Sequence, residues 1–118
     1  MLLDCIFTAD TGITKVQLGR PWRPYAQTVV LYSELGAHID LAGWLEWAGI
    51  VNHLTAYYAE YKNTGPGYVP DKRVSWSHQL TDEEAAAYTI QNVFSKGSVD
   101  PAYGADWLPE GTVRLKGN

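Results

Sequence analysis

Short apolar runs, each bounded by turn-forming residues, recur along the first half of the chain. They are rich in β-branched and aromatic residues and end at Gly, Pro, Asp or Asn, a pattern that predicts β-strands. Four runs have this character: LLDCIFTA (2–9), ITKVQL (13–18), TVVLYSEL (28–35) and TAYYAEY (55–61). Residues 38–54 have no clean period, and Trp44 and Trp47, three apart, leave a helical face and a packed loop open.

One helix is well marked, over residues 81–94 (TDEEAAAYTIQNVF). Thr81 and Glu84 have the spacing of a capping box, in which each side chain accepts a hydrogen bond from the other residue's backbone N–H. Four apolar residues are expected to share one face of this helix: Ala86, Ile90, Val93 and Phe94. The tail over 95–118 is rich in Gly, Pro and isolated aromatic residues and is predicted to wrap over the surface.

The order of these elements predicts an all-β fold with one accessory helix. A length of 118 residues fits a single domain with a modest core. No Asn-Gly or Asp-Gly turn joins neighbouring strands, which argues against a simple meander of hairpins. The pattern by itself leaves a sandwich, a jelly roll and a solenoid open.

The formal net charge of −4 argues against a nucleic-acid binder, because no large basic face is visible. The charge is nonetheless uneven along the chain. No acidic residue lies between Asp10 and Glu34, whereas Lys15, Arg20 and Arg23 all do. A local positive patch on an acidic protein is suited to an anionic ligand, and a solvated loop is the alternative.

The first ten residues, MLLDCIFTAD, have an acid at position 4 and no basic segment, so they do not predict a signal peptide. No stretch has the apolar length of a membrane span. The one cysteine, Cys5, is expected to be a small buried hydrophobic residue, and it excludes an intrachain disulfide and a Cys-based zinc site. The three histidines lack the spacing of a metal site and no phosphate-binding glycine loop is present, so neither a metal nor a cofactor is predicted.

Residues 15–28, KVQLGRPWRPYAQT, place an Arg-Pro step on each side of a tryptophan. Proline disfavours the α region for the residue before it, so Arg20 and Arg23 are expected to be extended. Since residues two apart in an extended chain point the same way, Arg20 and Trp22 are expected to share a face, with Arg23 on the other. A guanidinium beside an indole suits an acidic sugar, because it holds a carboxylate while the ring stacks on the sugar. The alternative is a structural arginine that pins a loop, with the tryptophan in the core.

Two glutamates lie between aromatic residues, Glu46 in WLEW and Glu60 in YAEY. Each is a candidate acid or base whose pKa would be raised by an apolar setting. Pairing with a lysine or arginine is the alternative that we favour. Nothing in the sequence places the two carboxylates opposite each other across a cleft, as a glycosidase requires.

Five blocks of sequence occur in an order and spacing that we associate with one family: LGRPW (18–22), RPYAQTVV (23–30), GWLEW (43–47), YYAEYKNTGPG (57–67) and RVSWSHQLTDEEAAAYT (73–89). Together they resemble the C-terminal part of pectin methylesterases, also called pectinesterases. The resemblance covers nearly the whole chain. The stretch SHQLTDEEA is more similar to the bacterial branch of the family than to the plant branch.

The resemblance implies a right-handed parallel β-helix, a solenoid, of which residues 1–118 would form one C-terminal segment. Rungs and loops would occupy 1–80, with the helix at 81–94 and the tail at 95–118 outside them. The family hydrolyses galacturonate methyl esters in pectin without a metal or organic cofactor, with one aspartate as nucleophile and a second as general acid and base. By position in LGRPW, Arg20 corresponds to the arginine that holds the nucleophilic aspartate, and Trp22 to the tryptophan that stacks on the sugar.

The family's catalytic aspartates lie upstream of LGRPW, in stretches that resemble QDTLY and DFIFG. Neither stretch is present here, and Asp4 and Asp10 fit neither of them. The chain is therefore expected to be a C-terminal fragment of such an esterase, inactive by itself. Its partner would be pectin or methylated polygalacturonate, and by resemblance it would be secreted or periplasmic, although it carries no signal.

Two other functions stay open at this point. One is a non-catalytic domain that binds acidic polysaccharide, and the other is a purely structural, self-assembling β-solenoid. A solenoid without its preceding rungs exposes an unpaired parallel edge, which pairs readily with another chain. Self-association through residues 2–9 is therefore expected.

Overall fold

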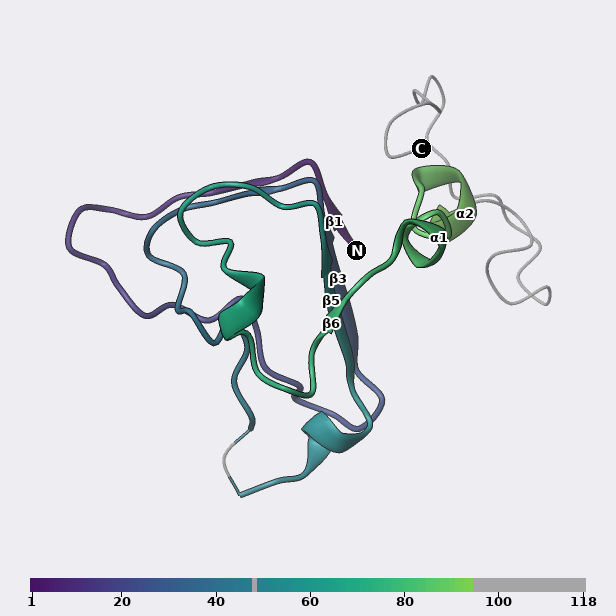
Figure 1. Ribbon diagram of the computed structural model, residues 1–118. Helices are drawn as coiled ribbons and strands as arrows, with labels where there is room; N and C mark the ends of the chain where they lie inside the picture. Colours follow the sequence, from purple (N-terminus) through teal and green to yellow (C-terminus); the bar gives the residue numbers. More distant parts are fainter. Residues whose placement is uncertain (48, 95–118) are drawn as a thin grey trace. The chain divides into compact units, whose positions relative to one another are not determined.

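The chain divides into two units in the computed structural model, Met1–Leu80 and Thr81–Asn118, and the structure describes residues 1–47 and 49–94 (Figure 1). The first unit consists of short strands joined by long loops. It also holds two single-turn 3-10 helices, Asn52–Leu54 and Pro70–Lys72. Among the described residues no helix is long and apolar enough to cross a membrane.

The strands of the first unit all pair in parallel and form two sheets. One sheet has four strands in the order β1 (Leu2–Leu3), β3 (Gln27–Leu31), β5 (Tyr57–Tyr61) and β6 (His78–Gln79). The other pairs β2 (Ile6–Phe7) with β4 (Glu34–Leu35). Figure 1 shows the four strands of the larger sheet side by side.

The register shows that the chain returns to the same place at nearly constant intervals. Leu2 faces Val30, 28 residues further on, and Val30 faces Glu60, 30 residues further on. The second sheet repeats these intervals, because Ile6 faces Glu34 and an isolated parallel bridge joins Glu34 to Thr64. We call the stretch of chain between one return and the next a pass. Successive passes lie on top of one another, and each pass includes the long connection that parallel strands require.

Each pass turns a corner through a residue with left-handed backbone. Asp4, Tyr32 and Lys62 have φ values of 54°, 50° and 47°, and the strand register places them at equivalent positions directly after β1, β3 and β5. None of the three is glycine, although this conformation costs other residues about 1–2 kcal/mol. The strands predicted over 2–9 and 28–35 are therefore each split into two short strands that belong to different sheets.

The corner is followed by a polar ladder that satisfies its backbone groups. The backbone N–H of Ser33 donates to Oδ1 of Asn63 (2.9 Å), and that of Cys5 donates to Oγ of Ser33 (3.0 Å). The side-chain amide of Asn63 also donates to the carbonyl of Val30 (3.2 Å). Ser33 and Asn63 are buried, whereas Cys5 is only half-buried, so the expectation of a buried hydrophobic cysteine is wrong.

The apolar core is formed by side chains from successive passes. Val30, Trp44 and Tyr58 form its centre, with Phe7 and Trp76 among the residues packed against it. Trp44 is fully buried, and its ring meets that of Tyr58 edge-on at 4.9 Å between centroids. Trp44 lies in a loop, so the packed-loop alternative is confirmed for this residue.

Of the two other predicted strands, one is confirmed and one is not. The predicted strand over 55–61 is confirmed as β5, whereas the one over 13–18 is reduced to a parallel bridge between Val16 and Ile39. Leu18 and Gly19 also bond to the 43–45 loop through their backbones, with a second bridge from Gly19 to Trp44. This side of each pass is held by single bridges rather than by a sheet.

The second unit begins with the predicted capping box, which is confirmed at Thr81 and Glu84. The single helix predicted over 81–94 is wrong, however, because two short helices take its place: α1 (Asp82–Ala85) and α2 (Ile90–Phe94). Thr89 is the cause, since its Oγ1 accepts from the backbone N–H of Asn92 (3.1 Å) and so starts a new helix. Ala86, assigned to the apolar face, is exposed. The predicted tail over 95–118 lies outside the described residues.

Replacement of Asn63 with alanine is expected to destabilise the first unit by about 2–3 kcal/mol, because it leaves the buried N–H of Ser33 without an acceptor. Urea denaturation followed by tryptophan fluorescence would measure the change. Gln27→Ala, at an exposed position on β3, is the matched control and should change stability by less than about 0.5 kcal/mol. Equal effects of the two substitutions would show that the polar ladder does not hold the corner.

Candidate functional site

The predicted site residues lie on a loop that is anchored at both ends. Pro21 is fully buried, and its carbonyl accepts a hydrogen bond from the buried side-chain amide of Asn52 (3.2 Å). Further along, the backbone N–H of Tyr25 donates to Oγ1 of Thr55 (3.0 Å). The loop from 19 to 25 is therefore fixed against residues 52–55 of the next pass.

Each arginine of this loop lies over an indole ring. The guanidinium carbon of Arg20 is 4.3 Å from the ring centroid of Trp47, and that of Arg23 is 4.7 Å from the centroid of Trp22. The expectation that Arg23 lies on the face opposite Trp22 is wrong. Residues 22–25 bend and turn rather than running extended, so the alternation of an extended chain does not hold there.

Arg20, Trp22 and Arg23 are all exposed, and 63% of the Trp22 surface is accessible. In the part of the chain that the structure describes, the two salt bridges involve neither arginine. Two guanidinium groups that lie over indoles, and that take part in neither of these salt bridges, can bind carboxylates, and an exposed indole can stack on a flat apolar surface. Sequence reasoning did not identify Trp47 as the partner of Arg20, although the GWLEW block marked its position.

Glu46 and Glu60 occupy two different environments. Glu46 is an exposed carboxylate 3.4 Å from Nε2 of His53, so its partner is a histidine rather than the lysine or arginine that we favoured. Glu60 is fully buried on β5 and is paired with Arg73, whose Nε lies 2.7 Å and Nη2 3.1 Å from its two oxygens. The pairing alternative is therefore confirmed for Glu60.

The Glu60–Arg73 pair is the buried centre of a larger hydrogen-bonded network that extends to the exposed Gln79. The carboxylate of Glu60 also accepts from the side-chain amides of Asn63 and Gln79, both at 3.3 Å. The guanidinium of Arg73 donates to three backbone carbonyls: those of Asp40, Leu41 and Gly67. The amide oxygen of Gln79 in turn accepts from the hydroxyl of Tyr68 (3.0 Å). Burial, and then the negative charge of Glu60, raise the pKa of Tyr68, while Arg73 opposes the rise.

A pocket of about 610 Å³ opens beside this network, lined by residues that include Tyr32, Tyr61, Lys62 and Tyr68. Because the carboxylate of Glu60 already accepts bonds from a bidentate arginine and two amides, it is not available as an acid or base for a ligand in this pocket. Glu60 therefore does not provide this pocket with a catalytic acid or base.

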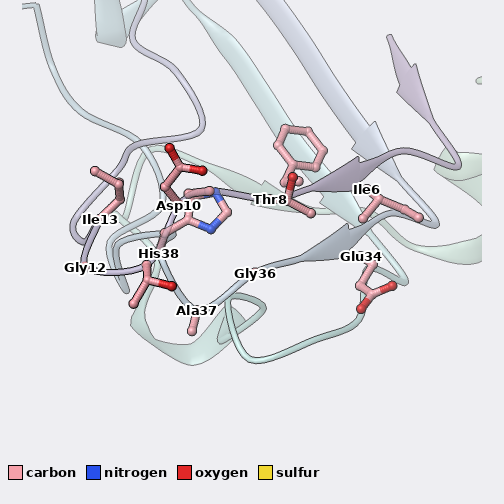
Figure 2. Close-up of a pocket in the computed structure, with 12 residues that line it drawn as sticks. Ile6, Thr8, Asp10, Gly12, Ile13, Glu34, Gly36, Ala37 and His38 are labelled. Atoms are coloured by element: carbon pink, nitrogen blue, oxygen red, sulfur yellow. The ribbon is translucent and has the colours of Figure 1, made fainter.

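A second pocket, of about 370 Å³, lies between residues 6–13 and residues 34–38 (Figure 2). Figure 2 shows Ile6 and Glu34 at one end of this pocket, and Asp10 and His38 at the other. No group of three or more His, Cys, Asp or Glu side chains that could hold a metal ion occurs among the described residues. Arg20 and Trp22 line neither of these two pockets, and the side chains of both are exposed.

The comparisons with known proteins identify the family. The family model described as pectinesterase matches residues 3–98, and the chain therefore belongs to the pectinesterase family. It is 45% identical over 87 residues to pectinesterase 3 of Solanum lycopersicum, a match that covers 71% of this chain and 16% of that protein. It is 36% identical over 117 residues to a pectinesterase/pectinesterase inhibitor of Brassica campestris, which covers 98% of this chain and 19% of the relative.

Two solved structures are similar to the chain. A pectin methylesterase from carrot has a TM-score of 0.63 and 37% sequence identity, and the match covers 75% of this chain and 29% of that one. A pectin methylesterase from Aspergillus niger has a TM-score of 0.62 and 26% identity, over 94% of this chain and 33% of that one. The chain thus spans less than a quarter of the length of these curated relatives and about a third of the solved chains. Because these proteins are from plants and a fungus, the closer likeness to the bacterial branch stays a prediction.

Replacement of Arg73 with alanine is expected to destabilise the first unit by about 3–5 kcal/mol, because it leaves the buried carboxylate of Glu60 without its counter-charge. Chemical denaturation followed by tryptophan fluorescence would measure the loss. Lys72→Ala removes the neighbouring exposed cation and should have an effect below about 0.5 kcal/mol. A loss at Arg73 no larger than that at Lys72 would contradict a structural role for the ion pair.

Proposed function

We propose that the chain forms part of a pectin methylesterase and supplies the surface that binds the galacturonan chain. The observation that carries this proposal is the anchored loop in which Arg20 and Arg23 lie on indole rings, with Trp22 exposed beside them. The surface offers a cation and an exposed ring, so a ligand for it has a carboxyl group and a flat apolar face. A galacturonate unit offers both.

Within that enzyme, Arg20 would hold the nucleophilic aspartate and Trp22 would stack on the sugar. The aspartate would attack the ester carbonyl and release methanol, and water would then hydrolyse the acyl-enzyme to free the carboxylate. Both aspartates belong to motifs that do not occur in these 118 residues. The role of this chain is therefore to bind and orient the sugar and the nucleophile, and by itself it does not catalyse the reaction.

The fold that suits this role is a right-handed parallel β-helix. It is supported by the parallel pairing of all described strands, by the returns after 28 and 30 residues and by the likeness to the two solved pectin methylesterases. Right-handed crossovers are nearly universal between parallel strands of one sheet, which supports the handedness. As in the family that it resembles, the protein would act outside the cytoplasm, in the secreted or periplasmic space.

The chain is expected to bind methyl-esterified oligogalacturonate, and Trp22→Ala to weaken that binding about 5-fold, because it removes the exposed stacking ring. Isothermal titration calorimetry would measure both affinities. Ile6→Ala is the matched control, since Ile6 is similarly exposed, at 69%, but lies on β2. Methanol release from highly methylated pectin should not exceed the uncatalysed rate, with or without Arg20→Ala.

Two outcomes would contradict this proposal. If the chain does not bind methyl-esterified oligogalacturonate, the proposed galacturonan-binding surface is wrong. Methanol release that is lost with Arg20→Ala would show that these residues contain a nucleophile, with Asp10 in the smaller pocket as the first residue to replace.

A structural, self-assembling role is a second candidate, which the edges of the sheets favour. Among the described residues β1 pairs only with β3, and β2 only with β4, and the side chains of Leu2 and Ile6 are 39% and 69% exposed. An exposed parallel edge with apolar side chains is a site for pairing with another chain.

Light scattering coupled to size-exclusion chromatography is expected to show concentration-dependent association of the chain. Ile6→Lys should shift the population toward the monomer, because a charged side chain on an edge strand opposes pairing. A protease-resistant monomer at all concentrations would exclude this assembly. Ile13→Lys, at an exposed residue outside the strands, is the control for added charge.

A further inference from the structure

We infer that Arg23, supported on the ring of Trp22, binds the free carboxylate of a de-esterified galacturonate unit. This inference rests on the proposed function and deepens it, because it names the form of the substrate that the surface prefers. The preferred ligand is a galacturonan that carries free carboxylates as well as methyl esters. Arg23 is a specificity-determining residue in this scheme and takes no part in the ester chemistry.

The backbone around Arg23 is fixed, so its side chain starts from a defined position. Pro24 follows it and restricts its conformation, and Tyr25 has left-handed backbone with a φ of 61°. The carbonyl of Arg23 accepts from the backbone N–H of Ala26 (3.4 Å), which closes the turn. The bond from Tyr25 to Thr55 then ties this turn to the next pass of the chain.

The indole of Trp22 supports the guanidinium of Arg23. Cζ of Arg23 lies 4.7 Å from the ring centroid of Trp22, which is within the distance of a cation–π contact. A planar fork in this arrangement matches the two oxygens of a carboxylate. Part of the entropy cost of ordering a long side chain is met before a ligand arrives.

The arginines of the first unit differ in what already occupies their donors. Arg73 is buried and bonds to Glu60 and to three backbone carbonyls. Arg23 is exposed and takes part in neither salt bridge of the described residues, and its own stretch of chain, from 11 to 33, contains no acid. Arg73 therefore has a structural partner, whereas the charge of Arg23 is left for a ligand.

The charge of the ligand provides the discrimination. A free carboxylate gives Arg23 a charge-assisted, two-point contact, whereas a methyl ester offers only a neutral carbonyl oxygen. Because the site is exposed, the carboxylate contributes the binding free energy of a well-aligned surface ion pair rather than that of a buried one. We expect the wild-type chain to bind fully de-esterified oligogalacturonate about 5-fold more tightly than the fully methyl-esterified oligomer of the same length.

The test measures the affinity of both oligomers by titration calorimetry for the wild-type chain and for Arg23→Gln. The substitution should abolish the preference, with affinity for the methyl-esterified oligomer changed by less than about 2-fold. Arg23→Lys should retain only part of it, since an ammonium cannot form the two-point contact. Lys15→Gln is the matched control, because Lys15 is an exposed cation of the same acid-free stretch.

Each outcome decides between the hypotheses. If the wild-type chain binds neither oligomer, the proposed function itself fails. If it binds both and Arg23→Gln leaves the preference intact, the proposed function stands and the inference about Arg23 is wrong. If Lys15→Gln lowers the preference as much as Arg23→Gln does, the preference comes from the general positive charge of the stretch, which also overturns a specific site at Arg23.

Discussion

The ion pair between Glu60 and Arg73 determines where the loops of the first unit lie. A carboxylate and a guanidinium that are both out of contact with solvent must satisfy each other, because removal of either partner leaves a buried charge that costs several kcal/mol. Arg73 meets this constraint while also bonding to carbonyls at 40, 41 and 67. Gly43 lies against it in left-handed backbone, and a Cβ at that position would clash with the Arg73 side chain. The pair thus joins three segments that are far apart in sequence.

The Glu60–Arg73 pair also affects the candidate binding surface, because Arg73 bonds to the loop over residues 40–45. The backbone of Gly43 accepts a hydrogen bond from Leu18 (2.6 Å), and Gly19 accepts one from Leu45 (3.1 Å), so the 40–45 loop and the residues before Arg20 are joined edge to edge. Trp47 follows directly in that loop and lies beneath the guanidinium of Arg20. A buried charge on one pass therefore helps to position an exposed charge on another, without direct contact between them.

Much of this could be predicted from the sequence, but only where the signal is local. The strand at 55–61, the capping box at Thr81 and the pairing of Glu60 follow from residue types over a few positions. The corner that splits two predicted strands could not be found in this way, because its left-handed residues are Asp4, Tyr32 and Lys62 rather than glycines. The break between α1 and α2 was missed although its signal is local. Thr89 is a local signal for a helix start, and the apolar period across it concealed the break.

The stacking of the passes could not be predicted from the sequence, because equivalent positions in successive passes carry different residues. Cys5, Ser33 and Asn63 follow the same corner, and the spacing between them changes from 28 to 30 residues. A backbone ladder requires only that some side chain or backbone group accept each N–H, so it does not impose a sequence repeat. The pairing of side chains across passes, such as Arg20 with Trp47, follows from that stacking and was equally out of reach.

The strands and the loops of the first unit have different roles, and this difference explains why the proposed specificity resides in the loops. The strands and corners are bound by the ladder and by Glu60, so their polar groups are already committed to one another. The loops between them carry the exposed arginines and indoles, and one of the two stacks draws its cation from one pass and its ring from the next. In the proposed function, a surface assembled across passes would contact several sugar units of the ligand, and a substitution in one loop would alter one of these contacts. Preference for free or esterified units can therefore change at Arg23 while the buried network beneath it stays the same.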